Sequence, residues 1–314
     1  MITFKAKTDS GEIIKSALSH FIFPAGEPSV TKEPKRDLES TEIAIIQPSP
    51  DSLHDDLFKL AMWEDYITRT FPINGTNGPT PKLVVVIPYF PGARADRGAP
   101  FGASVYAMFF YKMMIDQIIL FDPHSSVVVE ELEYLMGKDA VTVVNSDELL
   151  GQPALGPYMD VYDYIIAPDK GATERAGAVA DALGIPCLTA EKTRDFETGK
   201  LSGFSIDLPE SDKDWPIYLI VDDICDGGGT FLGLFDAMDL EYGQVDLFVS
   251  HGVLSKDAIT NLTEKFENVF TTNSYNPQRK LVLPGMETEQ DYISLQYSPF
   301  TRLDVIHLLL SKVK

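Results

Sequence analysis

Six short segments of this 314-residue sequence are almost continuously apolar and rich in Val and Ile, and they constrain the fold more than any other feature. They are residues 42–46, 82–90, 117–122, 162–169, 216–223 and 244–252. Strands buried on both faces have this composition, and such strands belong to parallel sheets covered by helices. Amphipathic stretches lie between them, for example residues 173–184 and 230–243, each closing on a glycine suited to a helix C-terminus. The alternation predicts an α/β fold.

The two halves of the chain repeat one pattern, in which a buried strand runs into a loop of small residues and then a helix. VVVIPYFPGARAD at 84–96 is answered by YIIAPDKGATERA at 164–176. The turn-rich segment at 148–156 lies between the halves, so we expect an N-terminal domain at 1–149 and a C-terminal domain at 150–314. The Pro- and Gly-rich segment at 71–82 is expected to be a surface loop of the first domain.

Charge and cysteine content exclude several classes of protein. The chain has 26 basic and 47 acidic residues, a net charge of −21, and no run of Lys or Arg, which disfavours binding to nucleic acids or anionic membranes. Cys187 and Cys225 lack metal-ligand spacing and do not argue for secretion. No targeting segment and no run of about 18 apolar residues is found. We therefore expect a soluble, cytoplasmic protein without nucleic-acid or membrane partners.

The segment YLIVDDICDGGGTFLGLF at 218–235 carries the strongest chemical signal. A buried strand ends in Asp222 and Asp223, which could hold sugar hydroxyls or a Mg²⁺-bound sugar. A loop then leads into a helix, and its residues are Asp226, Gly227, Gly228, Gly229 and Thr230. Glycines let the backbone approach an anion, and the amides at a helix N-terminus bind phosphate. No lysine precedes Thr230, so the loop is not a Walker loop. The pattern predicts a phosphate site rather than a tight turn with two solvated acids.

This segment resembles the 5-phosphate loop of type I phosphoribosyltransferases, and other segments narrow the resemblance to the ribose-phosphate diphosphokinase family. These segments follow the family order and are FPAGE at 23–27, residues 84–100, FDPHSS at 121–126, PDKGATERA at 168–176, EKTR at 191–194 and SHGVLS at 250–255. The resemblance implies two tandem type I phosphoribosyltransferase-like domains, each a mainly parallel sheet flanked by helices. The N-terminal domain would bind ATP, and the C-terminal domain would carry a diphosphate loop and a ribose-5-phosphate loop.

The resemblance also implies the reaction. The anomeric hydroxyl of ribose 5-phosphate attacks the β-phosphorus of MgATP, the diphosphoryl group is transferred and AMP leaves. Because negative charge develops on the transferring group, we expect Lys192 and Arg194 to stabilise it as catalytic residues. His124 is expected to ligate the Mg²⁺ carried by ATP and to be catalytic, and Asp169 to ligate a second Mg²⁺ and the diphosphate. Outside this family pattern, each of the four would be read as a solvated or structural residue.

The remaining implied contacts concern ATP and the diphosphate. The residues expected to bind ATP are Phe23, Glu27, Arg94 and Asp96. Phe23 and Glu27 would reach adenine from a neighbouring subunit, so a homo-oligomer is expected. The amides of Lys170, Gly171 and Ala172 would cradle the diphosphate beside Asp169.

The acceptor and two alternative functions stay open. Three glycines, Gly227–Gly229, replace the common DTxGT pattern of the family, which opens the rim of the loop and makes ADP-ribose a candidate acceptor beside ribose 5-phosphate. A type I phosphoribosyltransferase is one alternative, but it would not need the duplicated architecture or the Asp-x-His and Lys-x-Arg segments. A catalytically inactive regulatory paralogue is the other, and the retained His124, Asp169, Lys192 and Arg194 argue against it.

Overall fold

The computed structural model describes residues 1–71, 79–194, 201–210, 212–275 and 300–314. These residues form two compact units. As far as the ranges are described, unit 1 consists of Met1–Val144, Ser274–Gln278 and Val305–Lys314, and unit 2 consists of Asn145–Asn273 and Arg279–Asp304. Each unit has its own sheet and its own cluster of buried apolar side chains.

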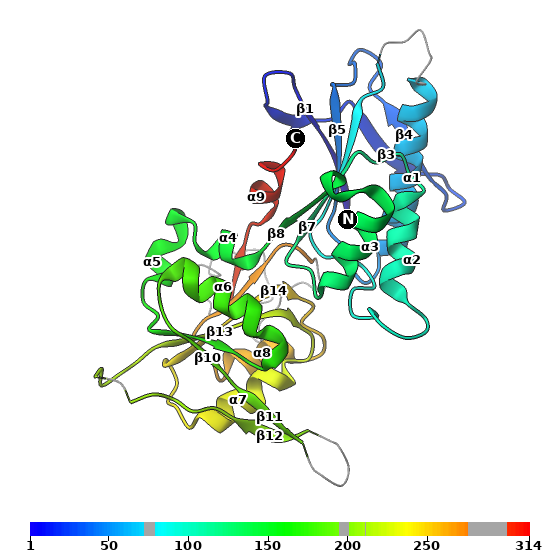
Figure 1. Cartoon of the computed structure of the whole chain (residues 1–314). Coiled ribbons are helices and arrows are strands. Elements are labelled where there is room, and N and C mark those ends of the chain that lie inside the picture. Colours follow the sequence, from blue (N-terminus) through cyan, green and yellow to red (C-terminus); the bar gives the residue numbers. More distant parts are fainter. Residues whose placement is uncertain (72–78, 195–200, 211, 276–299) are drawn as a thin grey trace. The chain divides into compact units, whose positions relative to one another are not determined.

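Unit 1 is built on a six-stranded sheet with the order β2-β1-β5-β6-β7-β8 (Figure 1). The strands are β1 (Ile2–Lys7), β2 (Ile13–Lys15), β5 (Thr41–Ile46), β6 (Lys82–Ile87), β7 (Gln117–Phe121) and β8 (Val141–Val144). Neighbouring strands from β5 to β8 are parallel, whereas β1 is antiparallel to both β2 and β5. A separate antiparallel hairpin consists of β3 (Leu18–Ile22) and β4 (Pro28–Lys32). The unit is therefore mainly parallel, with an antiparallel edge.

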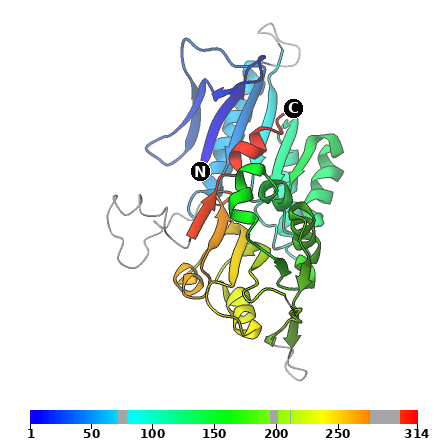
Figure 2. The same cartoon turned by 90° about the vertical axis from the view of Figure 1, so that its left-hand side faces the viewer.

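Helices cover both faces of this sheet. One face carries α1 (Leu53–Thr70), α2 (Gly102–Tyr111) and α3 (Ser126–Met136), and the other carries α9 (Ile306–Leu310), as Figures 1 and 2 show. The core includes Trp63 of α1, which is fully buried and stacks on Phe4 of β1 with ring centroids 5.9 Å apart. Burial on both faces explains why β5, β6 and β7 are apolar after their first one or two residues.

Unit 2 contains a second six-stranded sheet, with the order β10-β9-β13-β14-β15-β16, in which every neighbouring pair is parallel. The strands are β9 (Tyr164–Ala167), β10 (Cys187–Thr189), β13 (Tyr218–Cys225), β14 (Val245–Gly252), β15 (Val269–Thr272) and β16 (Phe300–Leu303). From β9 the chain passes to β10 on one side and later to β13 on the other side. The order of strands thus reverses between β9 and β13, which is where open α/β sheets bind ligands.

The helices of unit 2 follow its strands. They are α4 (Ser146–Leu150), α5 (Gly156–Met159), α6 (Thr173–Leu183), α7 (Gly229–Met238) and α8 (Ala258–Thr263). Buried side chains of α7 and α8 join the apolar cluster that includes Ile220 of β13. A hairpin of β11 (Glu191–Arg194) and β12 (Leu201–Ser205) extends from the sheet and packs on α7.

The structure confirms the predicted α/β class, and each of the six apolar segments overlaps one strand. Helix α6 ends as predicted, because Gly184 adopts a left-handed φ of 71°. The end predicted for the helix after residue 230 is wrong. That helix, α7, stops at Met238 and not near Gly243, because Asp239 itself adopts a left-handed conformation with φ 52°.

The division into units differs from the expected domains at 1–149 and 150–314. The chain changes units between Val144 and Asn145, and Val305–Lys314 returns to unit 1. The Gln117 side chain explains the return: its Nε2 donates to the Lys312 carbonyl at 3.1 Å, and its Oε1 accepts from the Lys314 amide at 3.0 Å. A search for boundaries along the sequence assumes contiguous domains and cannot detect such a contact.

Three minor expectations concern the loop at 71–82, membrane spans and cysteines. Most of the predicted loop lies outside the described residues. Within the described ranges, none of the helices has the length and apolar character needed to span a bilayer. Cys187 and Cys225 are both free thiols, and Cys225 is buried.

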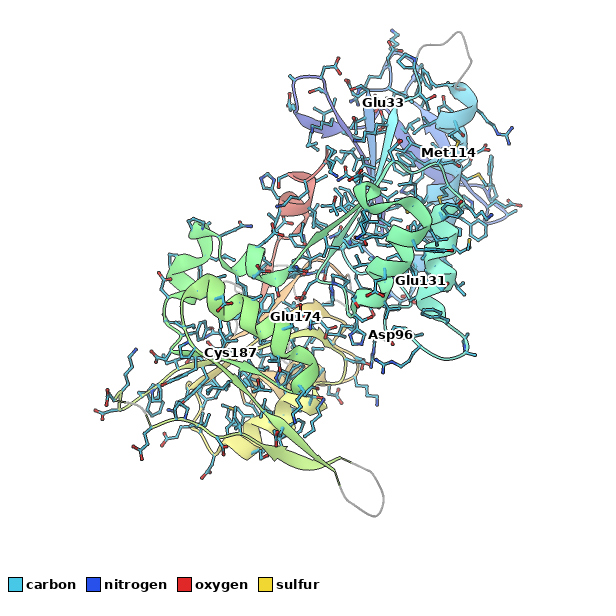
Figure 3. All side chains as sticks on the ribbon, in the orientation of Figure 1. Glu33, Asp96, Met114, Glu131, Glu174 and Cys187 are labelled. Carbon is cyan, nitrogen blue, oxygen red and sulfur yellow. The ribbon has the colours of Figure 1, made fainter. Side chains whose placement is uncertain are left out.

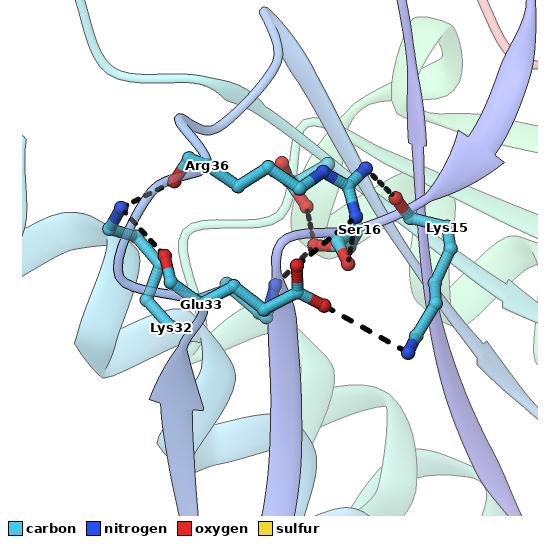
Figure 4. A network of polar contacts seen from close by, with 7 residues as sticks. Lys15, Ser16, Lys32, Glu33 and Arg36 are labelled. Carbon is cyan, nitrogen blue, oxygen red and sulfur yellow. Dashed lines mark hydrogen bonds and ion pairs between the residues drawn. The ribbon is translucent and has the colours of Figure 1, made fainter.

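A polar network covers the start of β5 in unit 1 (Figure 4). The Arg36 guanidinium donates to the carbonyls of Lys15 and Ser16. The Glu33 carboxylate forms two ion pairs, with Oε2 3.8 Å from Arg36 Nη1 and Oε1 4.0 Å from Lys15 Nζ. Beneath it, the Ser16 hydroxyl donates to Glu42 Oε2 at 2.5 Å, and the Glu39 amide donates to Glu42 Oε1 at 3.1 Å. Burial raises the pKa of Glu42 to about 7 in spite of these hydrogen bonds.

We expect Glu42→Gln to stabilise the protein more at high pH than at low pH. The folded state holds the Glu42 proton more tightly than the unfolded chain, whose Glu pKa is 4.5, so wild-type stability falls as the pH rises from 4.5 towards 7. Glutamine is neutral throughout and keeps one acceptor and a donor. The thermal midpoint of Glu42→Gln relative to wild type should therefore rise between pH 5 and pH 8. A constant difference would contradict the assignment, and Glu12→Gln, at an exposed carboxyl, is the matched control.

Candidate active site

The loops after β9 and β13 lie at the carboxyl ends of neighbouring parallel strands in unit 2. Register pairs Tyr218 with Tyr164 and Ile220 with Ile166, so both strands emerge at the same edge of the sheet. Asp169 follows β9, and Asp222 and Asp223 lie near the end of β13. The topology therefore brings together the two segments that the sequence associates with diphosphate and with ribose 5-phosphate.

The glycines before α7 have different structural roles. Gly228 adopts a left-handed φ of 79°, and a Cβ there would meet Leu262 Cδ2 at 3.3 Å, so the backbone requires glycine. A Cβ on Gly227 or Gly229 would meet no atom within 4 Å. In the described part of the chain, the N–H groups of Gly227, Gly229 and Thr230 have no hydrogen-bond acceptor. Unsatisfied amides at a helix N-terminus are the donors that a phosphate needs.

The two acids on β13 are largely buried side by side. Their side chains are 17% exposed for Asp222 and 8% exposed for Asp223. The Asp223 amide donates to Asp222 Oδ1 at 2.9 Å, and the Ile224 amide donates to Asp223 Oδ1 at 2.8 Å. Burial, and then the charge of Asp223, raise the pKa of Asp222 to about 7. Asp222 therefore exchanges its proton near neutral pH, and a nearby positive charge favours its ionised form.

Arg175 provides that charge, and the sequence analysis did not single it out. It lies in the first turn of α6, with Nη1 3.9 Å from Asp222 Oδ1 and Nη2 3.8 Å from Asp223 Oδ2. Both distances exceed that of a hydrogen bond, so they describe ion pairs. The signal in the sequence is that Arg175 lies in the first turn of α6, the helix that follows β9. This signal points to Asp222 and Asp223 only when β9 is known to pair with β13.

The loop after β9 is organised around Asp169. Its Oδ1 accepts from the amides of Gly171 at 2.8 Å and Ala172 at 3.2 Å, and its Oδ2 accepts from Lys192 Nζ of β11. Burial would raise the pKa of Asp169, but the hydrogen bond and charge of Lys192 and the two amides lower it below the usual value. Asp169 is therefore ionised. The amides of Gly171 and Ala172 point at this carboxylate, so a diphosphate would have to replace it as their acceptor.

Of two other predicted residues, Lys170 belongs to this loop and Arg194 to β11. Lys170 Nζ is 3.1 Å from Glu191 Oε1 of β11. The backbone of Arg194 belongs to β11, opposite Leu201 of β12, and its side chain lies outside the described part. The structure thus joins Lys192 to Asp169, whereas the contacts expected of the Arg194 side chain stay a prediction.

The residues expected to bind ATP lie in unit 1. Arg94 and Asp96 follow β6, and His124 follows β7, the neighbouring parallel strand. Asp96 (labelled in Figure 3) is buried, which would raise its pKa, but interactions with Ser125, Arg97 and His124 lower the pKa below its usual value. The structure therefore brings Asp96 and His124 near each other at one edge of the sheet of unit 1.

The loop after β7 has a constrained backbone. Asp122 is 3% exposed and adopts a left-handed φ of 40°, which is unfavourable for a residue other than glycine. Its amide donates to the Val144 carbonyl at 2.8 Å, which holds this conformation. The turn sets the direction in which the chain presents His124, whose side chain is exposed.

Phe23 and Glu27 form the turn of the β3–β4 hairpin. The Phe23 amide donates to the Glu27 carbonyl at 2.8 Å, and the Phe23 ring is 48% exposed beside Phe21, with centroids 4.8 Å apart. This exposed aromatic pair is distant in the sequence from the β6 and β7 loops. Contact with adenine from a neighbouring subunit stays a prediction.

Fold and loops together define a protein of the phosphoribosyltransferase class. The family model of the phosphoribosyl transferase domain matches residues 157–259, which lie in unit 2. The chain is 31% identical over 201 residues to a ribose-phosphate pyrophosphokinase of Pyrococcus furiosus, covering 62% of this chain and 67% of the relative. It is 29% identical over 280 residues to ribose-phosphate pyrophosphokinase A of Dictyostelium discoideum, covering 85% and 80%. The chain belongs to the ribose-phosphate pyrophosphokinase family.

A solved structure supports the architecture. The fold is similar to that of phosphoribosylpyrophosphate synthetase from Mycobacterium smegmatis, with a TM-score of 0.68, 22% identity and coverage of 95% of this chain and 89% of the other. These findings confirm the resemblance that the sequence motifs predicted, and the fold of two tandem phosphoribosyltransferase-like domains. By family the chain is an enzyme of the ATP-dependent diphosphotransferase class.

We expect Arg175→Met to raise the pKa of Asp222 further, because it removes the cation beside the two carboxylates. Arg175→Lys keeps the charge and should raise it less. The measurement is a titration of the Asp222 carboxyl by ¹³C NMR, which does not depend on activity. Arg69→Met, which breaks the exposed ion pair of Arg69 with Asp65, is the control. An unchanged Asp222 titration in Arg175→Met would show that Arg175 does not act on the pair.

Proposed function

We propose that this protein catalyses the Mg²⁺-dependent transfer of the diphosphoryl group of ATP to the anomeric hydroxyl of ribose 5-phosphate, or of a larger 5-phosphoribosyl compound such as ADP-ribose, with release of AMP. One observation carries the proposal: in unit 2, the unsatisfied amides at the start of α7 lie beside the buried Asp222–Asp223 pair. A phosphate and two vicinal hydroxyls need that combination of donors and acceptors.

The acceptor would be held at both of its ends. The amides of Gly227, Gly229 and Thr230 would bind the 5-phosphate, with the Thr230 hydroxyl as a further donor. Asp222 and Asp223, beside the positive charge of Arg175, would accept hydrogen bonds from the ribose hydroxyls. Fixing the sugar at both ends leaves the anomeric hydroxyl as the nucleophile and turns a bimolecular step into an oriented one.

Charge stabilisation would come from the diphosphate loop and β11. Lys192 already contacts Asp169, so its ammonium lies beside the loop that would bind the diphosphate. As negative charge grows on the transferring and leaving oxygens, Lys192 and Arg194 would stabilise it. The loop amides of Lys170, Gly171 and Ala172 would take part once the Asp169 carboxylate turns from them to another partner.

Magnesium fits the donor set. Mg²⁺ is usually held by one or two protein groups together with substrate phosphates, and no group of three metal-binding side chains occurs within the described residues. Asp169, ionised and 30% exposed, would hold one Mg²⁺ with the diphosphate, and His124 would hold the Mg²⁺ that arrives with ATP. When bound, Mg²⁺ neutralises phosphate charge.

The proposal extends to assembly and compartment. Exposed Phe23 and Glu27 would meet adenine from a neighbouring subunit, which requires a homo-oligomer. The free thiols of Cys187 and Cys225 suit the cytoplasm, where ATP is also available.

The test is acceptor-dependent release of AMP. The purified full chain is incubated with MgATP and ribose 5-phosphate or ADP-ribose, AMP is separated by chromatography, and the product mass is determined. We expect AMP and an acceptor gaining a diphosphate in equal amounts, and neither in excess EDTA. If the protein instead consumes an activated ribose diphosphate together with a nucleobase, and releases no AMP from ATP, the phosphoribosyltransferase alternative is favoured. Absence of both reactions would favour the inactive paralogue.

We expect Lys192→Ala and Arg194→Ala to lower kcat by about 10²–10³, the effect of removing one electrostatic donor, and to change KM for the acceptor little. In the wild type, the contacts of the Lys192 and Arg194 side chains with the transferring group should strengthen as negative charge develops in the transition state. Steady-state kinetics at saturating MgATP measure both parameters. Lys213→Ala, which breaks an ion pair with Asp163 away from these loops, is the control. An effect confined to the acceptor KM would contradict the assigned role.

We expect Gly227→Thr to shift the acceptor preference towards ribose 5-phosphate. The position has space for a side chain, and threonine restores the family pattern while narrowing the rim that an extended 5-phosphate must cross. The measurement is the ratio of kcat/KM for ribose 5-phosphate to that for ADP-ribose, in wild type and variant. A wild-type ratio of about a thousandfold in favour of ribose 5-phosphate, unchanged in the variant, would eliminate ADP-ribose as the acceptor.

A further inference from the structure

An aromatic ring of the β11–β12 hairpin lies directly against a glycine of α7. A Cβ placed on Gly233 would be 2.8 Å from Phe204 Cε2 and 3.2 Å from Phe204 Cδ2. The first distance is shorter than real Cβ contacts, so any side chain at Gly233 would displace the ring. Phe204 also packs against the buried apolar cluster of unit 2. The hairpin is therefore seated on α7 by a contact that only glycine permits.

Gly233 has no other evident reason to be a glycine. It lies in the interior of α7, where glycine is less favourable than alanine because it loses more backbone entropy. Its φ is not in the left-handed region, in contrast to that of Gly228 at the start of the helix. Close approach of the Phe204 ring is the feature that accounts for it.

The register of the hairpin connects this contact to the reaction. Phe204 of β12 lies directly opposite Lys192 of β11, and opposite residues of an antiparallel pair project from the same face. Lys192 in turn contacts Asp169 of the diphosphate loop. Gly233 lies four residues after Gly229, about one helical turn from the amides proposed to bind the 5-phosphate. The Phe204–Gly233 contact thus joins the strand that carries Lys192 to the helix that would carry the acceptor.

We propose that Phe204 is a positioning residue, which by packing on Gly233 fixes the place of the Lys192 ammonium relative to the 5-phosphate loop. This inference rests on the proposed role of Lys192. Because the ring touches neither substrate nor reacting atoms, its removal should impair transition-state stabilisation and leave the acceptor cradle intact.

The first test is Gly233→Ala. Helix propensity favours the alanine, so loss of fold is not the expected effect, but the ring must move. Since a displacement of about 1 Å can cost about 10² in rate, we expect kcat to fall about 10- to 10²-fold with little change in the acceptor KM. Phe204→Leu in the same chain removes the clash and should restore part of kcat. Gly177→Ala is the matched control, since Gly177 lies within α6 and a Cβ there meets nothing within 4 Å.

A second variant and a second readout keep the inference separate from the proposed function. Phe204→Ala removes the ring without a clash and should also lower kcat, whether or not Gly233→Ala folds. Hydrogen exchange of the amides of Glu191, Lys192 and Gly203–Ser205 should accelerate in both variants while β13 stays protected, even in a protein that releases no AMP. Unchanged hydrogen exchange in Phe204→Ala would overturn the inference. If the enzyme is active, a variant that changes the acceptor KM and leaves kcat unchanged would overturn it as well. If the wild type releases no AMP but hydrogen exchange accelerates in the variants, the result counts against the proposed function alone.

Discussion

The central constraint in unit 2 is the burial of two adjacent carboxyl groups, Asp222 and Asp223, on β13. Asp222 and Asp223 repel each other and have little water, so their ionisation has to be supported by nearby groups. Two backbone amides of the strand and the guanidinium of Arg175 provide that support.

The two loops of unit 2 that are proposed to bind anions have different hydrogen bonding. At the start of α7, the amides of Gly227, Gly229 and Thr230 have no hydrogen-bond acceptor among the described residues. After β9, the Asp169 carboxylate already accepts hydrogen bonds from the amides of Gly171 and Ala172 and from the Lys192 ammonium. The 5-phosphate would therefore enter a preformed site, whereas the diphosphate would exchange with an internal carboxylate. That exchange would also release Lys192 to follow the transferring group.

Much of this could be predicted from the sequence, because local patterns decided it. Apolar runs marked the strands, and the acids with the glycines of 226–230 marked the loop, since each reflects the neighbouring backbone. Arg175 could not be predicted, because its role arises from the pairing of β9 with β13. The return of Val305–Lys314 to unit 1 depends on Gln117, almost two hundred residues earlier. The Phe204–Gly233 contact likewise needs the register of the hairpin.

The central claim is that the N-terminus of α7 binds the 5-phosphate of the acceptor. Calorimetric titration of ribose 5-phosphate, in the presence of Mg²⁺ and an ATP analogue that cannot transfer its diphosphoryl group, tests it most directly. Thr230→Asp places a carboxylate at the helix terminus, where it favours the helix but repels a phosphate. We expect this variant to keep its thermal midpoint and to lose at least about tenfold in affinity, with ribose binding neither protein. Equal affinity of wild type and Thr230→Asp for ribose 5-phosphate would contradict the claim.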